Sequence, residues 1–430
     1  MRAIDIRAAF LQAEPLKREV FIQPPKDVAE EGKIWKLLKP IYGLDDASRR
    51  FWITVKKIFK EFKLNPVTGD EAFYMKHVDG NLVGIVASHV DDFLVAGTAE
   101  FVDELTSTVM KYLTISKIED KRFRFTGIDV EQGEDTITLS MEDYASSIDA
   151  IKEIRKGKKT EPLTKIELKI FRKMTGKISW LAENCRPDLS FYALDMSKKN
   201  NNATLGDLLK VNKVIQKIKG RTSKVVFRKV GEPKELIVFG IGDASYKSDE
   251  KAIGGEFVFL GNKDSNVAVP LFWKSKTIRQ VCHSAKDAET RLLVKLVDTT
   301  RSFTDQLEEL FFGARTKTIP IKLFTDSLPT LESIASTKQV EQRLLRNSYT
   351  ELKERLENGE ILMYVWLDTN DMLADILTKD SKDNIDVHDV TRENKFRLGN
   401  VEDNMVAFND GEITIKNRRE KNKEGREKCL

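Results

Sequence analysis

Residues 88–95 read Ser88-His89-Val90-Asp91-Asp92-Phe93-Leu94-Val95 and place two adjacent carboxylates between two apolar runs. The runs, residues 82–87 and 93–97, are rich in β-branched side chains, which predicts two buried strands joined by a tight turn. Burying two charges is costly unless a partner compensates them, and Mg²⁺ is a common partner of carboxylate oxygens. A solvated hairpin with aspartates at its turn is equally compatible with this stretch.

The composition predicts a folded protein of two or three structural units. The chain has 430 residues, of which 40% are hydrophobic and 33% charged, and this apolar content suffices for packed cores. The net charge is only +4, so any affinity for nucleic acid must come from local patches.

The cysteines and the apolar segments indicate the cellular compartment in which the protein is found. Cys185, Cys282 and Cys429 lie far apart and indicate neither a disulfide framework nor a zinc site, which fits a reducing compartment. We see no signal peptide and no apolar run long enough to span a membrane. We therefore expect an intracellular protein of the cytoplasm or the nucleus that is not secreted.

The first half of the chain predicts strands with amphipathic helices. Residues 3–11 resemble the end of a strand that runs into a helix, and Asp5 there is a third isolated carboxylate. From the residues alone, a helix N-cap explains Asp5 best. Apolar periodicity predicts further helices at 47–59 and 99–112, and strands at 123–130 and 136–140.

A composition change near residues 220–224 predicts the main domain boundary. Just before it, the helix at 208–218 carries lysines on its polar face, and the lysines from Lys210 to Lys224 either follow a nucleic-acid backbone or form a solvated surface. Beyond the boundary, the element order describes a mixed α/β layer. These elements are expected at residues 236–242, 254–260, 267–273, 285–312, 319–324, 362–367 and 372–379.

Carboxylates fall at the ends of elements in this second half. Asp243 and Asp326 end strands, Glu289 lies early in the long helix, and Asp375 lies in the last helix. Four carboxylates converging at one end of a sheet would repel one another unless cations neutralise them, and two divalent cations form the clamp of phosphodiester chemistry. Each residue singly is more often a solvated carboxylate; only the set in this order favours a metal site.

Seven short blocks occur in a characteristic order. They are residues 5–11, Ile41-Tyr42-Gly43-Leu44 with Arg49 and Trp52, His89-Val90-Asp91-Asp92, Arg186-Pro187-Asp188-Leu189, residues 272–276, Ala288-Glu289, and residues 374–379. Together they resemble the reverse transcriptase and ribonuclease H segment of a copia-type LTR retrotransposon Pol polyprotein.

The resemblance implies an α+β polymerase palm and thumb followed by an α/β ribonuclease H-like domain with a five-stranded mixed sheet. We expect a palm at 1–145, thumb or connection helices at 146–222, the ribonuclease H-like domain at 223–380, and a basic, poorly ordered tail at 381–430. The family's fingers precede the Asp5 motif, and we expect them to be missing from this fragment.

The resemblance also implies a polymerase site. Asp5, Asp91 and Asp92 would hold Mg²⁺ or Mn²⁺ and act on an incoming dNTP. Phe10 would contact that nucleotide and exclude a ribose 2′-hydroxyl, although simple core packing explains the ring as well. Two departures are visible, because Asp45-Asp46 replace the usual Lys-Gln and His89 replaces a tyrosine.

A ribonuclease H site is implied in the second half. Asp243, Glu289, Asp326 and Asp375 would hold Mg²⁺ or Mn²⁺ and cleave the RNA strand of an RNA–DNA hybrid, with Asp368 and Asp371 as alternatives to Asp375. RNA, DNA and their hybrid are the expected partners, no membrane is expected, and the oligomeric state is left open.

The predicted function is therefore RNA-directed DNA synthesis, impaired by the missing fingers, together with two-metal ribonuclease H cleavage. A non-catalytic nucleic-acid-binding remnant of a transposable element is the alternative. An unrelated metal-dependent nuclease is a third interpretation, which requires the block order to be accidental.

Overall fold

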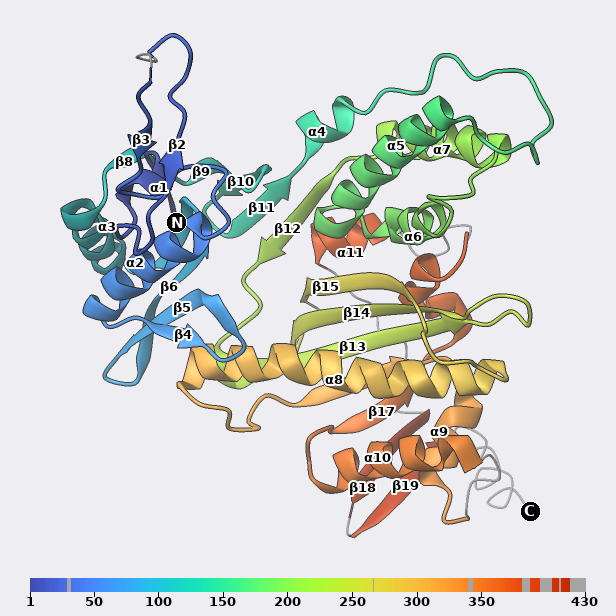
Figure 1. Ribbon diagram of the computed structural model, residues 1–430. Coiled ribbons are helices and arrows are strands. Elements are labelled where there is room, and N and C mark those ends of the chain that lie inside the picture. The colour runs from blue at the N-terminus through green and yellow to red at the C-terminus, as the bar shows by residue number, and fades with distance from the viewer. Residues whose placement is uncertain are drawn as a thin grey trace, which may run out of the picture. The chain divides into compact units, whose positions relative to one another are not determined.

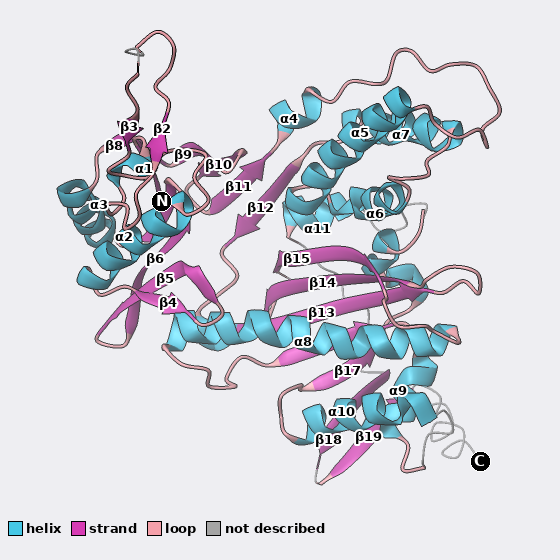
Figure 2. Cartoon of the chain, viewed as in Figure 1, coloured by secondary structure: helices cyan, strands magenta, loops and turns pink. Residues whose placement is uncertain are grey.

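The computed structural model describes residues 1–28, 32–265, 267–338, 343–380, 387–394, 404–409 and 411–417 (Figure 1). Two compact units are formed, the first from residues 1–132 and 309–315 and the second from residues 133–308 and 316–430. Figure 2 shows that both units contain helices as well as strands. Within the described ranges, no helix has the length and apolar character needed to cross a bilayer.

The first unit is built on a six-stranded sheet. Its elements are β1 (Arg2–Ile6), α1 (Ala9–Gln12), β2 (Phe21–Ile22), β3 (Trp35–Lys36), α2 (Ala47–Glu61), β4 (Asn65–Val67), β5 (Asp70–Val78), β6 (Asn81–His89), β7 (Asp92–Gly97), α3 (Ala99–Tyr112), β8 (Ile115–Asp120), β9 (Arg122–Phe125) and β10 (Ile128–Gln132). The sheet order is β4-β5-β6-β7-β1-β8. Apolar side chains of β1, β6 and β7 meet those of α2 and α3 in one core.

The predicted central hairpin is confirmed. β6 and β7 pair antiparallel, with Ser88 opposite Phe93 and His89 opposite Asp92. Val90 and Asp91 form the two-residue turn, and Val90 takes a φ of 54°, the left-handed conformation that tight hairpin turns require. The predicted helices at 47–59 and 99–112 are present as α2 and α3.

The single strand predicted over residues 123–130 is wrong. The chain turns at Thr126 and Gly127, whose φ values are 48° and 85°, so β9 and β10 pair with each other as a hairpin. The break is visible as a change of phase, because Phe123 and Phe125 occupy odd positions whereas Ile128 and Val130 occupy even ones. The prediction took these apolar residues as one run and overlooked that change.

The second unit contains a helical part and a large mixed sheet. Its elements are β11 (Thr136–Ser140), α4 (Glu142–Ser146), α5 (Lys165–Asn184), η1 (Pro187–Leu189), α6 (Ser190–Lys198), α7 (Leu205–Lys219), β12 (Lys224–Arg228), η2 (Pro233–Glu235), β13 (Leu236–Ser245), β14 (Ile253–Asn262), β15 (Ala268–Thr277), α8 (Ala285–Phe312), β16 (Ile321–Thr325), α9 (Leu328–Ala335), η3 (Arg343–Leu345), α10 (Arg346–Glu357), β17 (Met363–Trp366), η4 (Thr369–Asp371), η5 (Leu373–Leu377), α11 (Val387–Glu393), β18 (Asn404–Asn409) and β19 (Glu412–Asn417).

The sheet has seven strands where five were predicted. The order is β15-β14-β13-β16-β17-β18-β19, with β13, β16 and β17 parallel and the remaining neighbours antiparallel. β18 and β19 fall in the segment expected to be a poorly ordered tail. They are ordered because Val406 is fully buried and Ile413 and Ile415 pack against the core. The basic residues from Arg418 to Lys428 lie outside the described residues.

Glycines set the distance between this sheet and the elements on its two faces. A Cβ at Gly254 would lie 2.6 Å from the Leu292 side chain of α8, and a Cβ at Gly255 would lie 2.6 Å from Leu377 of η5. Successive strand residues point to opposite faces. α8 therefore covers one face, along which it runs in Figure 1, and η5 lies on the other.

Candidate metal centre

Three carboxylates from three elements converge at one end of the large sheet. Asp243 lies near the end of β13, Asp326 directly follows β16, and Glu289 lies in the second turn of α8. One carboxylate oxygen of each residue lies within 4.8 Å of those of the other two. Because β13 and β16 are parallel, their carboxyl ends meet at the same edge, as the sequence order predicted.

The cluster is poor in compensating donors. Thr378 donates its hydroxyl to Asp243 Oδ2, the Ala244 amide donates to Glu289 Oε1 at 2.9 Å, and the Thr369 hydroxyl donates to Asp326 Oδ2 at 3.2 Å. Asp243 and Glu289 are buried and Asp326 is half-buried. Burial is the main cause that raises the pKa of Asp243 to about 7, and it also raises the pKa values of Glu289 and Asp326.

A buried structural carboxylate in the same unit shows the contrast. Glu308 of α8 is fully buried and accepts hydrogen bonds from the amides of Thr316, Lys317 and Ile319, each at 3.0 Å. It also pairs with Arg301 at 2.9 Å. Glu308 is thus satisfied by the protein itself, whereas the three clustered carboxylates share few donors and repel one another, which fits a cation ligand set.

Asp375, the fourth predicted ligand, lies beside the cluster. Its charge contributes to the raised pKa values of Asp243 and Asp326, but its carboxylate pairs with Lys379 Nζ at 2.8 Å. Asp368, one of the two alternatives, accepts hydrogen bonds from the amide and side chain of Asn370. Asp371, the other alternative, is exposed. The assignment of Asp375 stays a prediction.

The sequence blocks contained two contributing residues whose role the sequence reasoning missed. Thr378 and Lys379 follow Asp375 by three and four residues, a spacing that returns to the same side of a helical turn. Thr378 is buried and contacts Asp243 directly, and Lys379 supplies a positive charge next to Asp375. Their helical spacing from Asp375 was the signal available in the sequence.

The palm carboxylates lie on neighbouring strands of the first unit. Asp5 of β1 is the register partner of Asp92 of β7, and Asp91 occupies the hairpin turn. Burial raises the pKa values of Asp5 and Asp92, and the charge of Asp91 raises both further. Asp5 is a strand residue rather than the helix N-cap that its local sequence favoured. In the part of the chain that the structure describes, only the Asp243 cluster brings three ligand atoms within mutual metal-binding distance.

Phe10 and Asp46 have structural partners. The Phe10 ring is buried and lies 4.5 Å from that of Tyr42 and 6.5 Å from that of Phe51, centroid to centroid, so core packing accounts for it; the nucleotide-contacting role stays a prediction. Asp46, one of the two unusual acidic residues, pairs with Arg18 at 3.0 Å and Arg50 at 2.9 Å. These arginines, Arg18 first, lower the pKa of Asp46 to about 2.

The Arg186-Pro187-Asp188 block has a structural role. Arg186 is fully buried and binds Asp188 through two parallel bonds of 2.8 Å. Its remaining donors reach the carbonyl oxygens of Lys217, Ile218 and Arg221 at 3.2–3.3 Å. The guanidinium therefore satisfies the open carbonyls at the end of α7 and joins α7 to the segment that precedes α6.

Comparisons with known proteins agree with the resemblance to a retrotransposon Pol polyprotein. Residues 1–164 match the family model described as "Reverse transcriptase (RNA-dependent DNA polymerase)". In an alignment 416 residues long that covers 87% of this chain, the sequence is 22% identical to the Transposon Ty1-GR2 Gag-Pol polyprotein of Saccharomyces cerevisiae, and the alignment covers 22% of that protein. The Truncated transposon Ty1-A Gag-Pol polyprotein of the same yeast is also 22% identical and 33% covered.

The chain thus spans about a fifth to a third of the length of these relatives. A solved structure of the foamy viral protease-reverse transcriptase in complex with an RNA/DNA hybrid aligns with 90% of this chain and 45% of that chain, at a TM-score of 0.48 and 15% identity. The sequence matches confirm the predicted resemblance to the Pol part of a copia-type retrotransposon and support a reverse transcriptase domain in residues 1–164.

Proposed function

We propose that this copia-type Pol segment cleaves the RNA strand of RNA–DNA hybrids at the Asp243–Glu289–Asp326 cluster. The observation that carries the proposal is the convergence of three carboxylates within 4.8 Å where the described residues supply few donors. Such a set is stable when divalent cations enter it, and paired cations are the usual catalysts of phosphodiester hydrolysis. Mg²⁺ or Mn²⁺ is the proposed cofactor.

The bound cations would supply electrophilic stabilisation of the phosphate and a more acidic attacking water. The protein's own contribution is to fix the ligands. β13 and β16 hold Asp243 and Asp326 at one edge, and Thr378 orients the Asp243 carboxylate through its hydroxyl. In the proposed hydrolysis, the water oxygen bonds to phosphorus, the bond from phosphorus to the 3′-oxygen breaks, and that oxygen receives the proton.

Cleavage of a labelled hybrid tests this proposal. The full chain should cut the RNA strand in Mg²⁺, leave single-stranded RNA and duplex DNA of the same sequence intact, and lose activity in EDTA. Asp243→Asn should abolish cleavage. Asp298→Asn is the matched control, because Asp298 lies on the same helix as Glu289 with a half-exposed side chain. Equal cleavage by the wild-type and Asp243→Asn chains would refute the proposal.

RNA-directed DNA synthesis is the second proposed activity. It is supported by the family match over residues 1–164 and by the pairing of Asp5 with Asp92 across adjacent strands. Primer extension on an RNA template with dNTPs should depend on Asp92, and Asp92→Asn should stop it. Hybrid binding with neither extension nor cleavage would instead support the non-catalytic remnant.

A further inference from the structure

Residues 378–380, at the end of η5, connect the acidic cluster to the helical part of the second unit. Thr378, the first of the three, donates its hydroxyl to Asp243. Asp380, the last, accepts a hydrogen bond from the hydroxyl of Tyr192 of α6. The short segment that orients a carboxylate of the cluster is therefore held at its other end by a helix that supplies none of the three clustered carboxylates.

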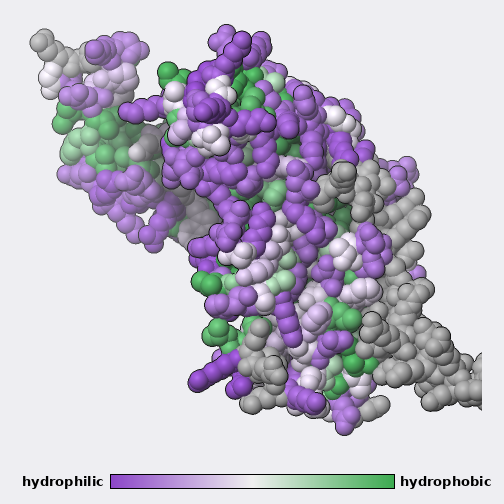
Figure 3. Space-filling view, turned by 90° about the vertical axis from the view of Figure 1, so that its right-hand side faces the viewer, coloured by the Kyte–Doolittle hydropathy of each residue, from purple (hydrophilic) through white to green (hydrophobic). Residues whose placement is uncertain are grey.

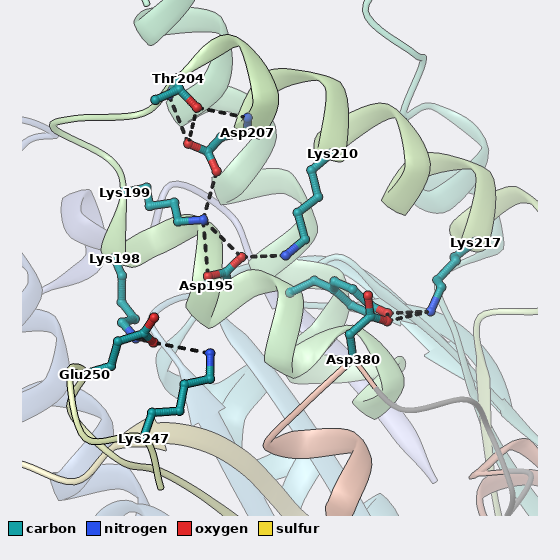
Figure 4. A network of polar contacts seen from close by, with 11 residues as sticks. Asp195, Lys198, Lys199, Thr204, Asp207, Lys210, Lys217, Lys247, Glu250 and Asp380 are labelled. Atoms are coloured by element: carbon teal, nitrogen blue, oxygen red, sulfur yellow. Dashed lines mark hydrogen bonds and ion pairs between the residues drawn. The ribbon is translucent and has the colours of Figure 1, made fainter. Parts of the chain in front are cut away.

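Figure 4 shows the contacts around Asp380. Its carboxylate lies 3.7 Å from Lys217 Nζ of α7, and the same ammonium group donates to the Tyr192 hydroxyl. Because an ammonium group cannot accept a hydrogen bond, the single proton of that hydroxyl is directed at Asp380. Hydrogen bonds to a charged group are roughly twice as strong as those between neutral groups, so this arrangement fixes the direction of the Asp380 side chain.

Tyr192 differs from the polar side chains at the surface of the molecule. Figure 3 shows a face dominated by hydrophilic side chains, and exposed ion pairs contribute little because water competes for both partners. Tyr192, in contrast, is only 6% exposed, so the position of its ring is set by the packing of α6. Asp380 is itself exposed, and its place therefore depends on the contacts that Tyr192 and Lys217 provide.

The helices and the sheet pack together around η5. Both η1 and α6 contact η5, which also contacts β13 and β14. The indole N–H of Trp273 in β15 donates to the carbonyl oxygen of Ala182 in α5 at 2.7 Å. A displacement of α6 is therefore expected to move residues 378–380 relative to the carboxyl end of β13.

We propose that Tyr192 is a positioning residue for the acidic cluster. By holding Asp380 in place, its hydroxyl keeps Thr378 directed at Asp243. The proposal rests on the proposed function, because it takes the cluster to be the site of Mg²⁺ or Mn²⁺. Groups that orient a metal ligand without touching the metal change the affinity for that metal. α6 and α7 thus contribute to cation affinity although the ligands come from other elements.

Binding of Mn²⁺ to the full chain tests the proposal without cleavage, with free Mn²⁺ measured by electron paramagnetic resonance. The binding that is lost in Asp243→Asn belongs to the cluster. Tyr192→Phe keeps the buried ring and removes only the hydroxyl. This variant should weaken the binding of Mn²⁺ to the cluster by roughly tenfold, the lower end of the range for outer partners of metal ligands.

Asp195→Asn is the matched control. Asp195 also lies on α6 and also belongs to the network in Figure 4, but it binds Lys199 and Lys210 rather than Asp380. The variant weakens the attachment of α6 to α7 and leaves the contact between Tyr192 and Asp380 in place. It should therefore bind Mn²⁺ at the cluster as tightly as the wild-type chain.

An equal loss of Mn²⁺ affinity in Tyr192→Phe and Asp195→Asn would overturn the proposal, because general loosening of the helices would then account for it. Unchanged affinity in Tyr192→Phe would overturn it as well. Selective weakening in Tyr192→Phe, in a protein whose wild-type chain never cleaves a hybrid, would refute the proposed function and leave this inference intact. Cleavage that requires Asp243, combined with Mn²⁺ binding that does not depend on the Tyr192 hydroxyl, would refute only this inference.

Discussion

Asp243 is a buried carboxyl whose ionisation depends on what else enters the cluster. The Thr378 hydroxyl is a weak source of compensation compared with the arginine and three amides around Glu308. Glu289 and Asp326 add negative charge at close range. Proton uptake or a cation can relieve this repulsion, so protonation and metal binding should compete at these residues.

The pH dependence of stability follows from this competition. Burial, before all other causes, raises the pKa of Asp243 to about 7, whereas an unfolded aspartate has a pKa of about 3.9. The folded state therefore keeps a proton that the unfolded chain loses, and stability falls as pH rises from about 4 through about 7.

Thermal unfolding in EDTA between pH 5 and 8 measures this loss. Asp243→Asn should lose less stability than the wild-type chain over that range, and Mg²⁺ should reduce the wild-type loss. Parallel pH profiles for the two proteins would contradict the assignment of the proton to this cluster.

The buried Arg186 is expected to be needed for the stability of the folded chain. Arg186→Met leaves Asp188 buried without its bidentate partner and the end of α7 without its donors, which should cost about 3–5 kcal/mol of unfolding free energy. Denaturant unfolding measures this change. Lys229→Met removes one member of an exposed pair with Glu232 and should leave the midpoint unchanged. A similar midpoint for both variants would show that the buried pair is not needed for stability.

Among the elements, the close contact of η5 with β14 positions the metal centre. Gly255 is the register partner of Asp243, and η5, which lies over Gly255, leads directly into Thr378. A Cβ at Gly255 would stand 2.6 Å from Leu377 Cβ and 3.0 Å from the Ala374 carbonyl oxygen. Side-chain volume at this position should move η5 and with it the hydroxyl that orients Asp243.

Gly255→Ala should therefore destabilise the second unit by about 1–3 kcal/mol. Gly176→Ala is the matched control, because this glycine lies inside α5 with no atom within 4 Å of its added Cβ. That substitution should stabilise the protein by roughly 0.5–1 kcal/mol. Denaturant unfolding measures the free energy of unfolding of both variants. A Gly255→Ala protein as stable as the wild-type chain would contradict the close packing of η5 against β14.

The elements most visible in the sequence were those with a clean period. α3 and α8 have the predicted bounds, and the hairpin around Asp91 formed as expected, because one face of each is continuously apolar. β18 and β19 escaped prediction because charged and amide side chains surround their few apolar residues. β9 and β10 were merged because the turn at Thr126 and Gly127 shifts the phase of the apolar alternation by only one residue.

For the whole molecule, the order of the seven short sequence blocks predicted more of the site than the amino-acid composition did. The positions of Asp243, Glu289 and Asp326 at element ends were enough to bring them together, because parallel strands end at one edge. The hydrogen bond from Thr378 to Asp243 was not predictable in this way, because it joins two residues that lie 135 positions apart in the chain.

The most direct measurement of the central claim is the single-turnover rate at which the full chain hydrolyses the RNA strand of a hybrid in Mg²⁺. Glu289→Gln keeps the shape of a buried side chain in the cluster but removes its charge. The rate should fall by roughly 100-fold or more, while Glu332→Gln, an exposed change on α9, should leave it unchanged. Wild-type hydrolysis that persists at the same rate in Glu289→Gln would contradict the claim that this cluster is the catalytic centre.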